Sequence, residues 1–212
     1  MTYPYILFDW DGCLAKTLDV WLAAYQYAFG LYDIEVPDSE IIRVCFGRKE
    51  GPVELGVDDE YEFINHLVEY ADRKMKSVSL HESVEDTLNF LYESDATMGL
   101  ITSSKRELVE PVLERLNIDY FFEALMTQDD VTTLKPDPEV VFEMMGLLSA
   151  DQKQTIIVGD SPHDVGAGQN AGIATVYYYP ESNKKYYSQS VVDDSEADYV
   201  IKSIGQLIDI VA

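Results

Sequence analysis

Short apolar runs alternate with longer amphipathic segments over most of the chain, and this alternation restricts the fold more than any other feature. Apolar runs that predict strands cover residues 4–9, 97–102, 123–128, 155–160, 174–179 and 198–201. Segments with the pattern of helices cover residues 83–94, 105–117, 138–148, 163–171 and 204–211. Strands that alternate with helices are joined by right-handed crossovers and form a mainly parallel sheet covered on both faces. We therefore expect a three-layer α/β/α core.

A long stretch after the first strand interrupts this alternation. It contains no strand pattern, and its periodicity predicts helices over residues 18–32, 38–46 and 59–76, with a loop over residues 47–56. We expect residues 1–15 and 80–212 to form the core and residues 16–79 to form an inserted, all-helical domain. Residues 180–195 are rich in Ser, Asn, Lys, Tyr and Asp, and we expect a mobile surface loop there. The Lys-Lys-Tyr-Tyr cluster in that loop is expected to be solvated surface rather than a binding patch.

The charge of the chain is strongly acidic. With 15 Lys and Arg against 39 Asp and Glu, the formal net charge is −24. Such a field repels polyanions, which argues against nucleic acid or an anionic membrane surface as a partner. An anionic substrate would need local positive charge at its site, from a metal ion or a lysine. The acidic surface is compatible both with a salty cytosol and with ordinary solubility.

The remaining composition predicts a cytoplasmic protein. We expect it to be a monomer or a homodimer. Its two cysteines, Cys13 and Cys45, cannot form a disulfide framework, and we expect both to be reduced and partly buried. The N-terminus lacks the pattern of a secretory signal. No stretch approaches the roughly 18 consecutive apolar residues of a membrane span.

Two aspartates stand at the end of the first predicted strand, in the heptapeptide FDWDGCL of residues 8–14. In an extended segment residues i and i+2 point the same way, so Asp9 and Asp11 are expected to leave the strand toward one small volume. Two carboxylates there repel each other unless a bound cation, a shared proton or an acid/base division of labour compensates. The alternative is a turn that happens to be acidic, since Asp and Gly are common turn residues.

Polar residues also follow the other predicted strands. Thr102 and Ser103 end the second strand just before a helix, Lys135 follows the third, and Asp160 ends the fourth, with Asp164 four residues later. The carboxyl ends of parallel strands lie at one edge of a sheet, where ligands bind in open α/β folds. Together these residues offer carboxylates for a hard cation, hydroxyl and amide donors for phosphoryl oxygens, and one ammonium group.

Each of these residues has a simpler interpretation when it is taken alone. Thr102 and Ser103 are good helix caps, and most lysines, like Lys135, lie at the surface. Asp160 and Asp164 are typical of an acidic loop and the first turn of a helix, where the helix dipole favours negative charge. Their coincidence at successive strand ends favours a common site.

Four segments in this order, FDWDGCL, ITSS, LKPDP and VGDSPHDVGAGQNAG, resemble the signature motifs of the haloacid dehalogenase-like hydrolase superfamily. The layout is most similar to its phosphoglycolate phosphatase and beta-phosphoglucomutase-like branch, and the resemblance covers essentially the whole chain. It implies a Rossmann-like catalytic core, a helical cap formed by the insertion, and hydrolysis of a small phosphorylated metabolite with Mg²⁺ as the cofactor.

The resemblance also implies a role for each matching residue. Asp9 matches the nucleophile that becomes an aspartyl phosphate, and Asp11 matches the general acid and base. Thr102 and the amide of Ser103 match the phosphate-binding motif, and Lys135 matches the lysine that tethers nucleophile and phosphate. The implied metal ligands are Asp9, the backbone carbonyl of Asp11, Asp160, and Asp164 directly or through water.

Some positions depart from the family pattern or extend it. Trp10 and Cys13 replace residues of other types, and we expect both side chains to face away from the reacting phosphoryl group. Lys16 either reaches an anionic substrate or covers the hinge of the cap. In the cap, Arg48, and with it Lys49, is expected to contact an anionic group on the leaving portion of the substrate. The alternative is a solvated pair of cations.

Three functions compete for this set of residues. The first is a Mg²⁺-dependent phosphomonoester hydrolase. The second is a phosphomutase, which returns the phosphoryl group to its substrate. The third is a non-enzymatic phospho-acceptor of the receiver type, which has no use for a helical cap or for an acid two residues after the acceptor. A dehalogenase is not expected, because that chemistry needs no metal and would not retain Asp11, Asp160 and Asp164 together.

Overall fold

The computed structural model describes all residues from Met1 to Ala212, and its chain divides into two compact units. One unit comprises residues 1–16 and 79–212, and the other comprises residues 17–78. We call them the core unit and the cap unit. None of the helices is both long and apolar enough to cross a membrane.

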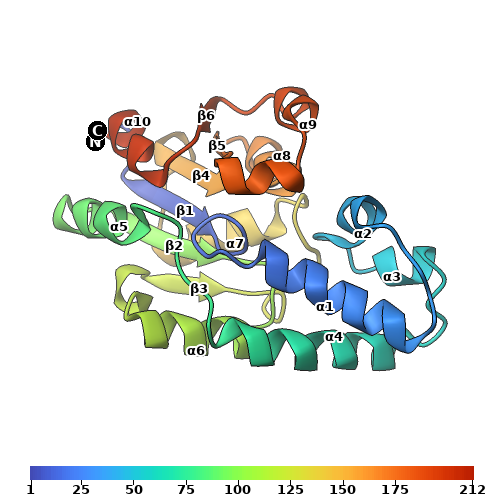
Figure 1. Cartoon of the computed structure of the whole chain (residues 1–212). Helices are drawn as coiled ribbons and strands as arrows, with labels where there is room; N and C mark the ends of the chain where they lie inside the picture. Colours follow the sequence, from blue (N-terminus) through green and yellow to red (C-terminus); the bar gives the residue numbers. More distant parts are fainter. The chain divides into compact units, whose positions relative to one another are not determined.

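The core unit is built on one six-stranded sheet (Figure 1). Its strands are β1 (Tyr5–Asp9), β2 (Thr97–Ile101), β3 (Ala124–Met126), β4 (Thr155–Gly159), β5 (Ala174–Tyr178) and β6 (Tyr199–Ile201). They lie in the order β3-β2-β1-β4-β5-β6, and every pair is parallel. The expected parallel α/β fold is confirmed.

The strand order reverses direction at β1, which gives the sheet its topological switch point. From β1 the chain builds outward to β2 and β3, and it then returns to the other side of β1 to add β4, β5 and β6. Ligands in open α/β sheets bind at the carboxyl ends of the strands beside such a point. Asp9, the last residue of β1, stands at this position.

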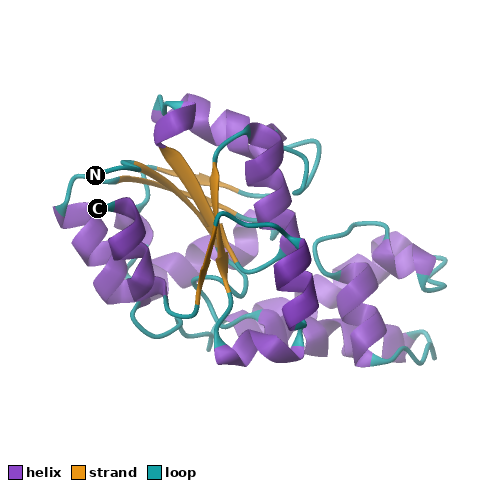
Figure 2. Ribbon diagram, turned by 90° about the horizontal axis from the view of Figure 1, so that it is seen from above, coloured by secondary structure: helices purple, strands orange, loops and turns teal.

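Helices cover both sides of the sheet (Figure 2). They are α5 (Val84–Glu93), α6 (Arg106–Leu116), α7 (Glu139–Leu148), α8 (Pro162–Ala171), α9 (Gln189–Asp194) and α10 (Leu207–Val211), with short 3₁₀ helices η1 (Asp119–Phe121), η2 (Gln152–Gln154), η3 (Glu181–Lys185) and η4 (Ile204–Gln206). Right-handed crossovers place α5 and α6 on the opposite face from α7 and α8, because the two pairs of connections run in opposite directions across the sheet. The chain ends lie together, since the backbone N–H of Thr2 donates to the carbonyl of Val211 at 2.8 Å.

One face of the sheet carries a continuous apolar core. Leu7 of β1 and Ile157 of β4 pack there against α7 and α8, through residues such as Val141, Met144 and Ala167. Because side chains alternate along a strand, Asp9 emerges on the same face as Leu7. Asp9 is therefore directed toward Lys135, in the loop before α7, and Asp164, in the first turn of α8.

The cap unit consists of helices α1 (Leu18–Leu31), α2 (Asp38–Cys45), α3 (Gly51–Glu54) and α4 (Glu60–Met75). Its core is aromatic: the rings of Tyr25, Phe29 and Phe63 contact one another, and Phe29 and Phe63 have centroids 4.8 Å apart. The hydroxyl of Tyr25 donates to the carbonyl of Cys45 at 3.2 Å. The short helix α3 lies within residues 47–56, where the sequence predicted only a loop.

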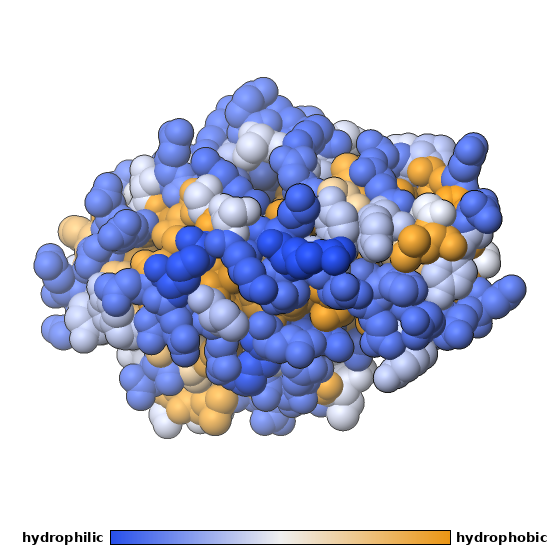
Figure 3. Space-filling model, turned by 60° about the horizontal axis from the view of Figure 1, so that its bottom comes forward, coloured by the Kyte–Doolittle hydropathy of each residue, from blue (hydrophilic) through white to orange (hydrophobic).

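Residues 180–195 also differ from the expected loop. They contain the 3₁₀ helix η3 and the helix α9, and the side chain of Asn183 is only 2% exposed. In the Lys-Lys-Tyr-Tyr cluster the two lysines are exposed, as expected, but the two tyrosines are half-buried and Tyr187 packs against the core. The polar composition of this segment suggested a loop, but its packing depends on partners distant in sequence. The face of the molecule shown in Figure 3 is mainly hydrophilic, with smaller hydrophobic areas.

Candidate active site

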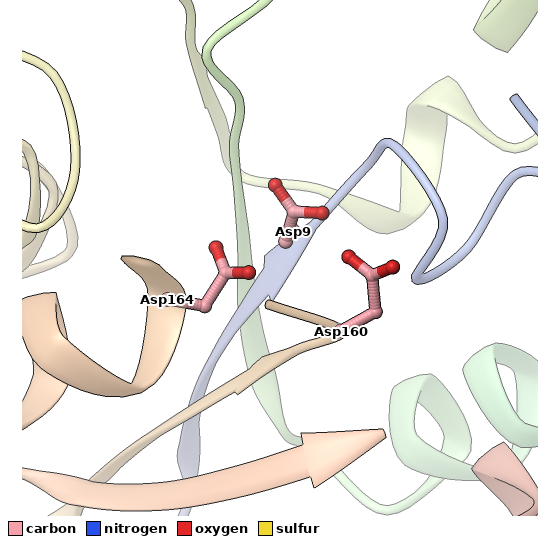
Figure 4. A group of neighbouring side chains, drawn as sticks. All are labelled: Asp9, Asp160 and Asp164. Carbon is pink, nitrogen blue, oxygen red and sulfur yellow. The ribbon is translucent and has the colours of Figure 1, made fainter. Parts of the chain in front are cut away.

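Three aspartates meet at the carboxyl ends of β1 and β4. Asp9, Asp160 and Asp164 are each at most 5% exposed, and one oxygen from each lies within 4.8 Å of the others. Their carboxylates face one common space (Figure 4). Asp9 ends β1, Asp160 directly follows β4, and Asp164 lies in the first turn of α8.

Lys135 is buried among these acids. Its Nζ donates to Asp9 Oδ1 at 2.5 Å and to Asp164 Oδ1 at 2.5 Å, and its side chain is 5% exposed. The alternative of a surface lysine is therefore wrong. The residue that follows Lys135 is held by a hydrogen bond, in which the side chain of Asn170 donates to the carbonyl of Pro136 at 2.9 Å. The peptide bond between Lys135 and Pro136 is cis.

Asp164 has two sets of partners. Its Oδ2 accepts from the backbone N–H of Ser161 at 3.1 Å and from the Ser161 hydroxyl at 2.6 Å, which forms a capping box at the start of α8. Its Oδ1 accepts from Lys135. Asp164 therefore stabilises the start of α8 and also belongs to the acidic cluster, so both interpretations of this residue are correct.

Acidic groups outnumber basic groups in this cluster, because three buried carboxyl groups surround one buried ammonium group. Burial first, and then the charge of Asp164, raises the pKa of Asp9 well above its ordinary value, although Lys135 opposes the shift. Burial and the charge of Asp9 raise the pKa of Asp160 in the same way. Burial lowers the pKa of Lys135, but the charges of Asp164 and Asp9 outweigh it and the net pKa is raised. The cluster therefore contains fewer cationic than acidic groups.

Asp11 has a different environment from Asp9. Its Oδ2 accepts from the hydroxyls of Thr102 at 3.1 Å and Ser104 at 2.6 Å. The strand ends at Asp9, and the chain then turns, with the backbone N–H of Ala15 donating to the carbonyl of Trp10 at 3.0 Å. The turn brings the carboxyl group of Asp11 to these hydroxyls at the end of β2. Asp11 stays close enough to Asp9 for its charge to contribute to the raised pKa of Asp9.

Residues 102–104 form a small hydroxyl cluster next to Asp11. Thr102 does not cap the following helix, whose N-cap is Lys105; its hydroxyl accepts from the backbone N–H of Ser104 at 3.0 Å. Ser103 is half-buried between Thr102 and Ser104. Ser104 was not among the predicted site residues, although its hydroxyl makes the shorter of the two contacts to Asp11. The run of three hydroxyl-bearing residues at positions 102–104 was the sequence feature that could have identified Ser104 as a site residue.

The departures from the motif are buried in the core unit. Trp10 is 1% exposed and Cys13 is 0% exposed, and the Cys13 thiol donates to the carbonyl of Val158 at 3.5 Å. Burial, followed by the charge of Asp9, raises the pKa of this thiol, which keeps it neutral. Lys16 has an exposed side chain at the end of the first core segment, and its backbone N–H donates to the carbonyl of Ser79 at 2.9 Å.

The predicted cap residues belong to the other unit. Arg48 forms a bidentate ion pair with Glu54 of α3, one of whose two hydrogen bonds measures 3.3 Å. Lys49 is exposed. The sequence pattern identified Arg48 as a cation of the cap but not the acid that pairs with it.

Comparison with known proteins identifies the family. The family model for haloacid dehalogenase-like hydrolases matches residues 6–178. The chain belongs to this family. A curated relative, pyrophosphatase PpaX from Halalkalibacterium halodurans, is 30% identical over 97% of this chain and 95% of its own. The expected enzyme class, a phosphatase of this family, is therefore supported by both the family and its named relatives.

Solved structures of this family have the same fold. A haloacid dehalogenase-like hydrolase from Bacteroides fragilis superposes with a TM-score of 0.86 at 23% identity, covering 97% of this chain and 99% of that one. A protein described as a predicted phosphoglycolate phosphatase, from Haemophilus somnus, superposes with a TM-score of 0.84 at 20% identity, covering 100% of this chain and 99% of that one. These similarities extend over both units of the chain.

Proposed function

We propose that this protein is a Mg²⁺-dependent phosphatase that hydrolyses a small phosphorylated metabolite through an aspartyl phosphate on Asp9. One observation carries the proposal: three buried carboxylates converge at the switch point of the sheet with a single ammonium group among them. The repulsion among these carboxylates, which Lys135 balances only in part, favours the binding of a cation.

The donor set fits Mg²⁺. All the candidate ligands are oxygens: the carboxylates of Asp9, Asp160 and Asp164, which lie close together, and the backbone carbonyl of Asp11, which the family resemblance adds. Hard divalent cations prefer such ligands, and no thiol or imidazole is among them. When bound, the cation would neutralise charge on the phosphoryl oxygens and on the attacking carboxylate.

The residues of the core unit divide the remaining chemistry among them. An oxygen of Asp9 forms a bond to phosphorus while the bond from phosphorus to the leaving oxygen breaks, and Asp11 gives that oxygen its proton. Asp11 then takes a proton from water, whose oxygen attacks phosphorus and frees Asp9. Covalent capture in this way replaces one difficult hydrolysis by two easier steps.

The polar neighbours of the two acids serve this sequence. Thr102 and Ser104 hold the carboxyl group of Asp11, and their hydroxyls together with the amide of Ser103 are donors for phosphoryl oxygens. Lys135 offsets the repulsion between the carboxylate of Asp9 and an incoming phosphate dianion.

The substrate belongs to the class of small phosphate esters or anhydrides. Phosphoglycolate and sugar phosphates are candidates because the layout of the motifs resembles the phosphoglycolate phosphatase and beta-phosphoglucomutase-like branch. Inorganic pyrophosphate is a further candidate because a relative from Halalkalibacterium halodurans that is 30% identical to this chain is named a pyrophosphatase. We propose that the cap unit closes over such substrates, excludes water and contributes Arg48 and Lys49 to specificity.

One experiment tests the proposal. Phosphate release is measured on a panel containing phosphoglycolate, several sugar phosphates and pyrophosphate, with Mg²⁺ or with EDTA, and Asp9→Asn is the blank. We expect release that requires Mg²⁺ and that falls by at least about 10³-fold in Asp9→Asn. Acid-quenched protein should carry one phosphoryl group on Asp9.

Two results would contradict the proposal. Undiminished release by Asp9→Asn, or in EDTA, would exclude this site as the source of the activity. Conversion of a sugar phosphate to its isomer without free phosphate would assign the same residues to a phosphomutase.

A further inference from the structure

Asn183 is a buried polar residue that neither the motifs nor the proposed mechanism assigns. It lies in η3, within the segment between β5 and β6, and is 2% exposed. Its Nδ2 donates to Asp160 Oδ2 at 2.8 Å and to the backbone carbonyl of Gly12 at 3.0 Å. Its Oδ1 accepts from the hydroxyl of Ser182 at 3.1 Å. Both partners of Nδ2 are acceptors, so the orientation of the amide is determined.

The backbone around Asn183 holds this amide in place. The backbone N–H of Asn183 donates to the carbonyl of Pro180 at 3.1 Å, and its own carbonyl accepts from the N–H groups of Tyr186 and Tyr187. A further hydrogen bond holds this segment, because the hydroxyl of Tyr179 donates to the carbonyl of Tyr187 at 2.7 Å. The side chain is therefore presented by an ordered turn.

The two partners of Asn183 come from different parts of the site. Gly12 lies three residues after Asp9 in the loop that follows β1, and Asp160 follows β4. A single amide group thus connects the loop that follows Asp9 and carries Asp11 to a candidate ligand of the cation. Gly12 has φ = 79°, a backbone conformation that favours glycine.

We propose that Asn183 is a positioning residue of the cation site: its amide holds Oδ2 of Asp160 and leaves Oδ1 of that carboxylate for the metal. This inference rests on the proposed Mg²⁺ site. Hydrogen bonds to charged acceptors are stronger than neutral ones, and groups that orient a metal ligand affect metal affinity although they do not touch the metal.

The chemical type of the residue matters here. A lysine or arginine at position 183 would neutralise Asp160 and compete with the cation. An amide donates a hydrogen bond but adds no net charge, so Asp160 stays oriented while its negative charge remains available. Lys135 already supplies the single buried ammonium group, on the Asp9 and Asp164 side of the cluster.

Metal binding tests this inference without any assay of activity. Mn²⁺ is titrated into metal-free protein, and the free ion is followed by electron paramagnetic resonance. Asn183→Leu removes both donors at similar volume, and we expect its Mn²⁺ affinity to fall by about 10- to 100-fold. Asn89→Leu is the matched control: it makes the same exchange at an exposed position of α5, and we expect a change within about twofold.

A third variant separates this inference from the proposed function. Asp160→Asn should lose nearly all Mn²⁺ affinity if the proposed cation site is correct. If Asp160→Asn binds Mn²⁺ as wild type does, or if wild type binds none, the proposed site fails and the inference fails with it. If Asp160→Asn loses binding but Asn183→Leu does not, the inference alone is overturned.

Nuclear magnetic resonance on the wild-type protein covers the case in which Asn183→Leu does not fold. The side-chain amide protons of Asn183 should exchange with solvent far more slowly than those of Asn89, whose side chain is exposed on α5. Their resonances should also move when Mg²⁺ is added, while those of Asn89 stay in place. Fast exchange, or no response to Mg²⁺, would overturn the inference.

Discussion

Asp164 occupies the space that a side chain at Gly159 would need. A Cβ built on Gly159 would lie 2.2 Å from the Cβ and 2.2 Å from the Cγ of Asp164. Because Asp164 lies in the first turn of α8, the absence of a side chain at the end of β4 lets that helix start close to the sheet. This close approach brings the Asp164 carboxylate to Lys135 and Asp9.

We expect Gly159→Ala to displace Asp164 and to weaken the site. Overpacking at a buried position costs about 1–3 kcal/mol, and the free energy of unfolding in urea should fall by that amount. Mn²⁺ affinity should fall with it. The control is Gly146→Ala on α7, where a new Cβ meets nothing within 4 Å. That variant should gain roughly 0.5–1 kcal/mol, because alanine favours a helix more than glycine does. Equal stability of the two variants would contradict the packing argument.

Lys135→Met should lower both activity and stability. It removes the only ammonium group that contacts Asp9 and Asp164, and breaking a buried ion pair from one side costs about 3–5 kcal/mol. We expect kcat to fall by about 10²–10³-fold, as for loss of one stabilising donor. Added Mg²⁺ should restore part of the stability, because it supplies positive charge to the same carboxylates. Unfolding in urea with and without Mg²⁺ measures this, and Lys153→Met, at an exposed position, is the control.

Glu139 makes stability depend on pH through the loop that precedes Lys135. Its carboxylate accepts hydrogen bonds from the backbone N–H and hydroxyl groups of Thr132 and Thr133. The Thr133 hydroxyl first, then the backbone amide of Thr133, lowers the pKa of Glu139 from 4.5 to about 2. A lowered pKa in the folded state stabilises the protein above the unfolded pKa. This contribution should be lost as the pH falls from about 4.5 to about 2.

The variant Glu139→Gln tests this dependence. Urea unfolding of wild type and Glu139→Gln should differ most near pH 6, and the difference should shrink below about pH 4.5. Glu143→Gln, an exposed position on the same helix, serves as the control. A difference between wild type and Glu139→Gln that is constant with pH would show that the hydrogen bonds do not depend on the charge of the carboxylate.

Arg48→Ala should raise KM for the preferred substrate, if Arg48 contacts an anionic group on its leaving portion. Slow hydrolysis of a simple aryl phosphate should change little, because that substrate lacks the second anion. Arg43→Ala is a matched control, since Arg43 is also a cap arginine in an ion pair, with Glu40. Equal losses on both substrates would instead assign Arg48 to the stability of the cap through Glu54.

The sequence alone determined the class of the fold and most of the site. Strands were readable as short continuous apolar runs because parallel strands are buried on both faces, and helices were readable from their period of 3.6 residues. Asp9, Lys135, Asp160 and Asp164 were identifiable because each follows a strand, and parallel strands bring their carboxyl ends to one edge of the sheet.

Tertiary structure decided which of those residues contact one another. The turn after Asp9 brings Asp11 to Thr102 and Ser104; the Asp-Gly pair in residues 8–14 indicated a turn, but not which residues Asp11 would contact. Asn183 is the clearest case, because its partners Asp160 and Gly12 are 23 and 171 residues away in the sequence. A polar residue in a polar segment carries no local sign of burial. Only the packing of the segment after β5 against the two strand ends removes Asn183 from water and requires it to have partners there.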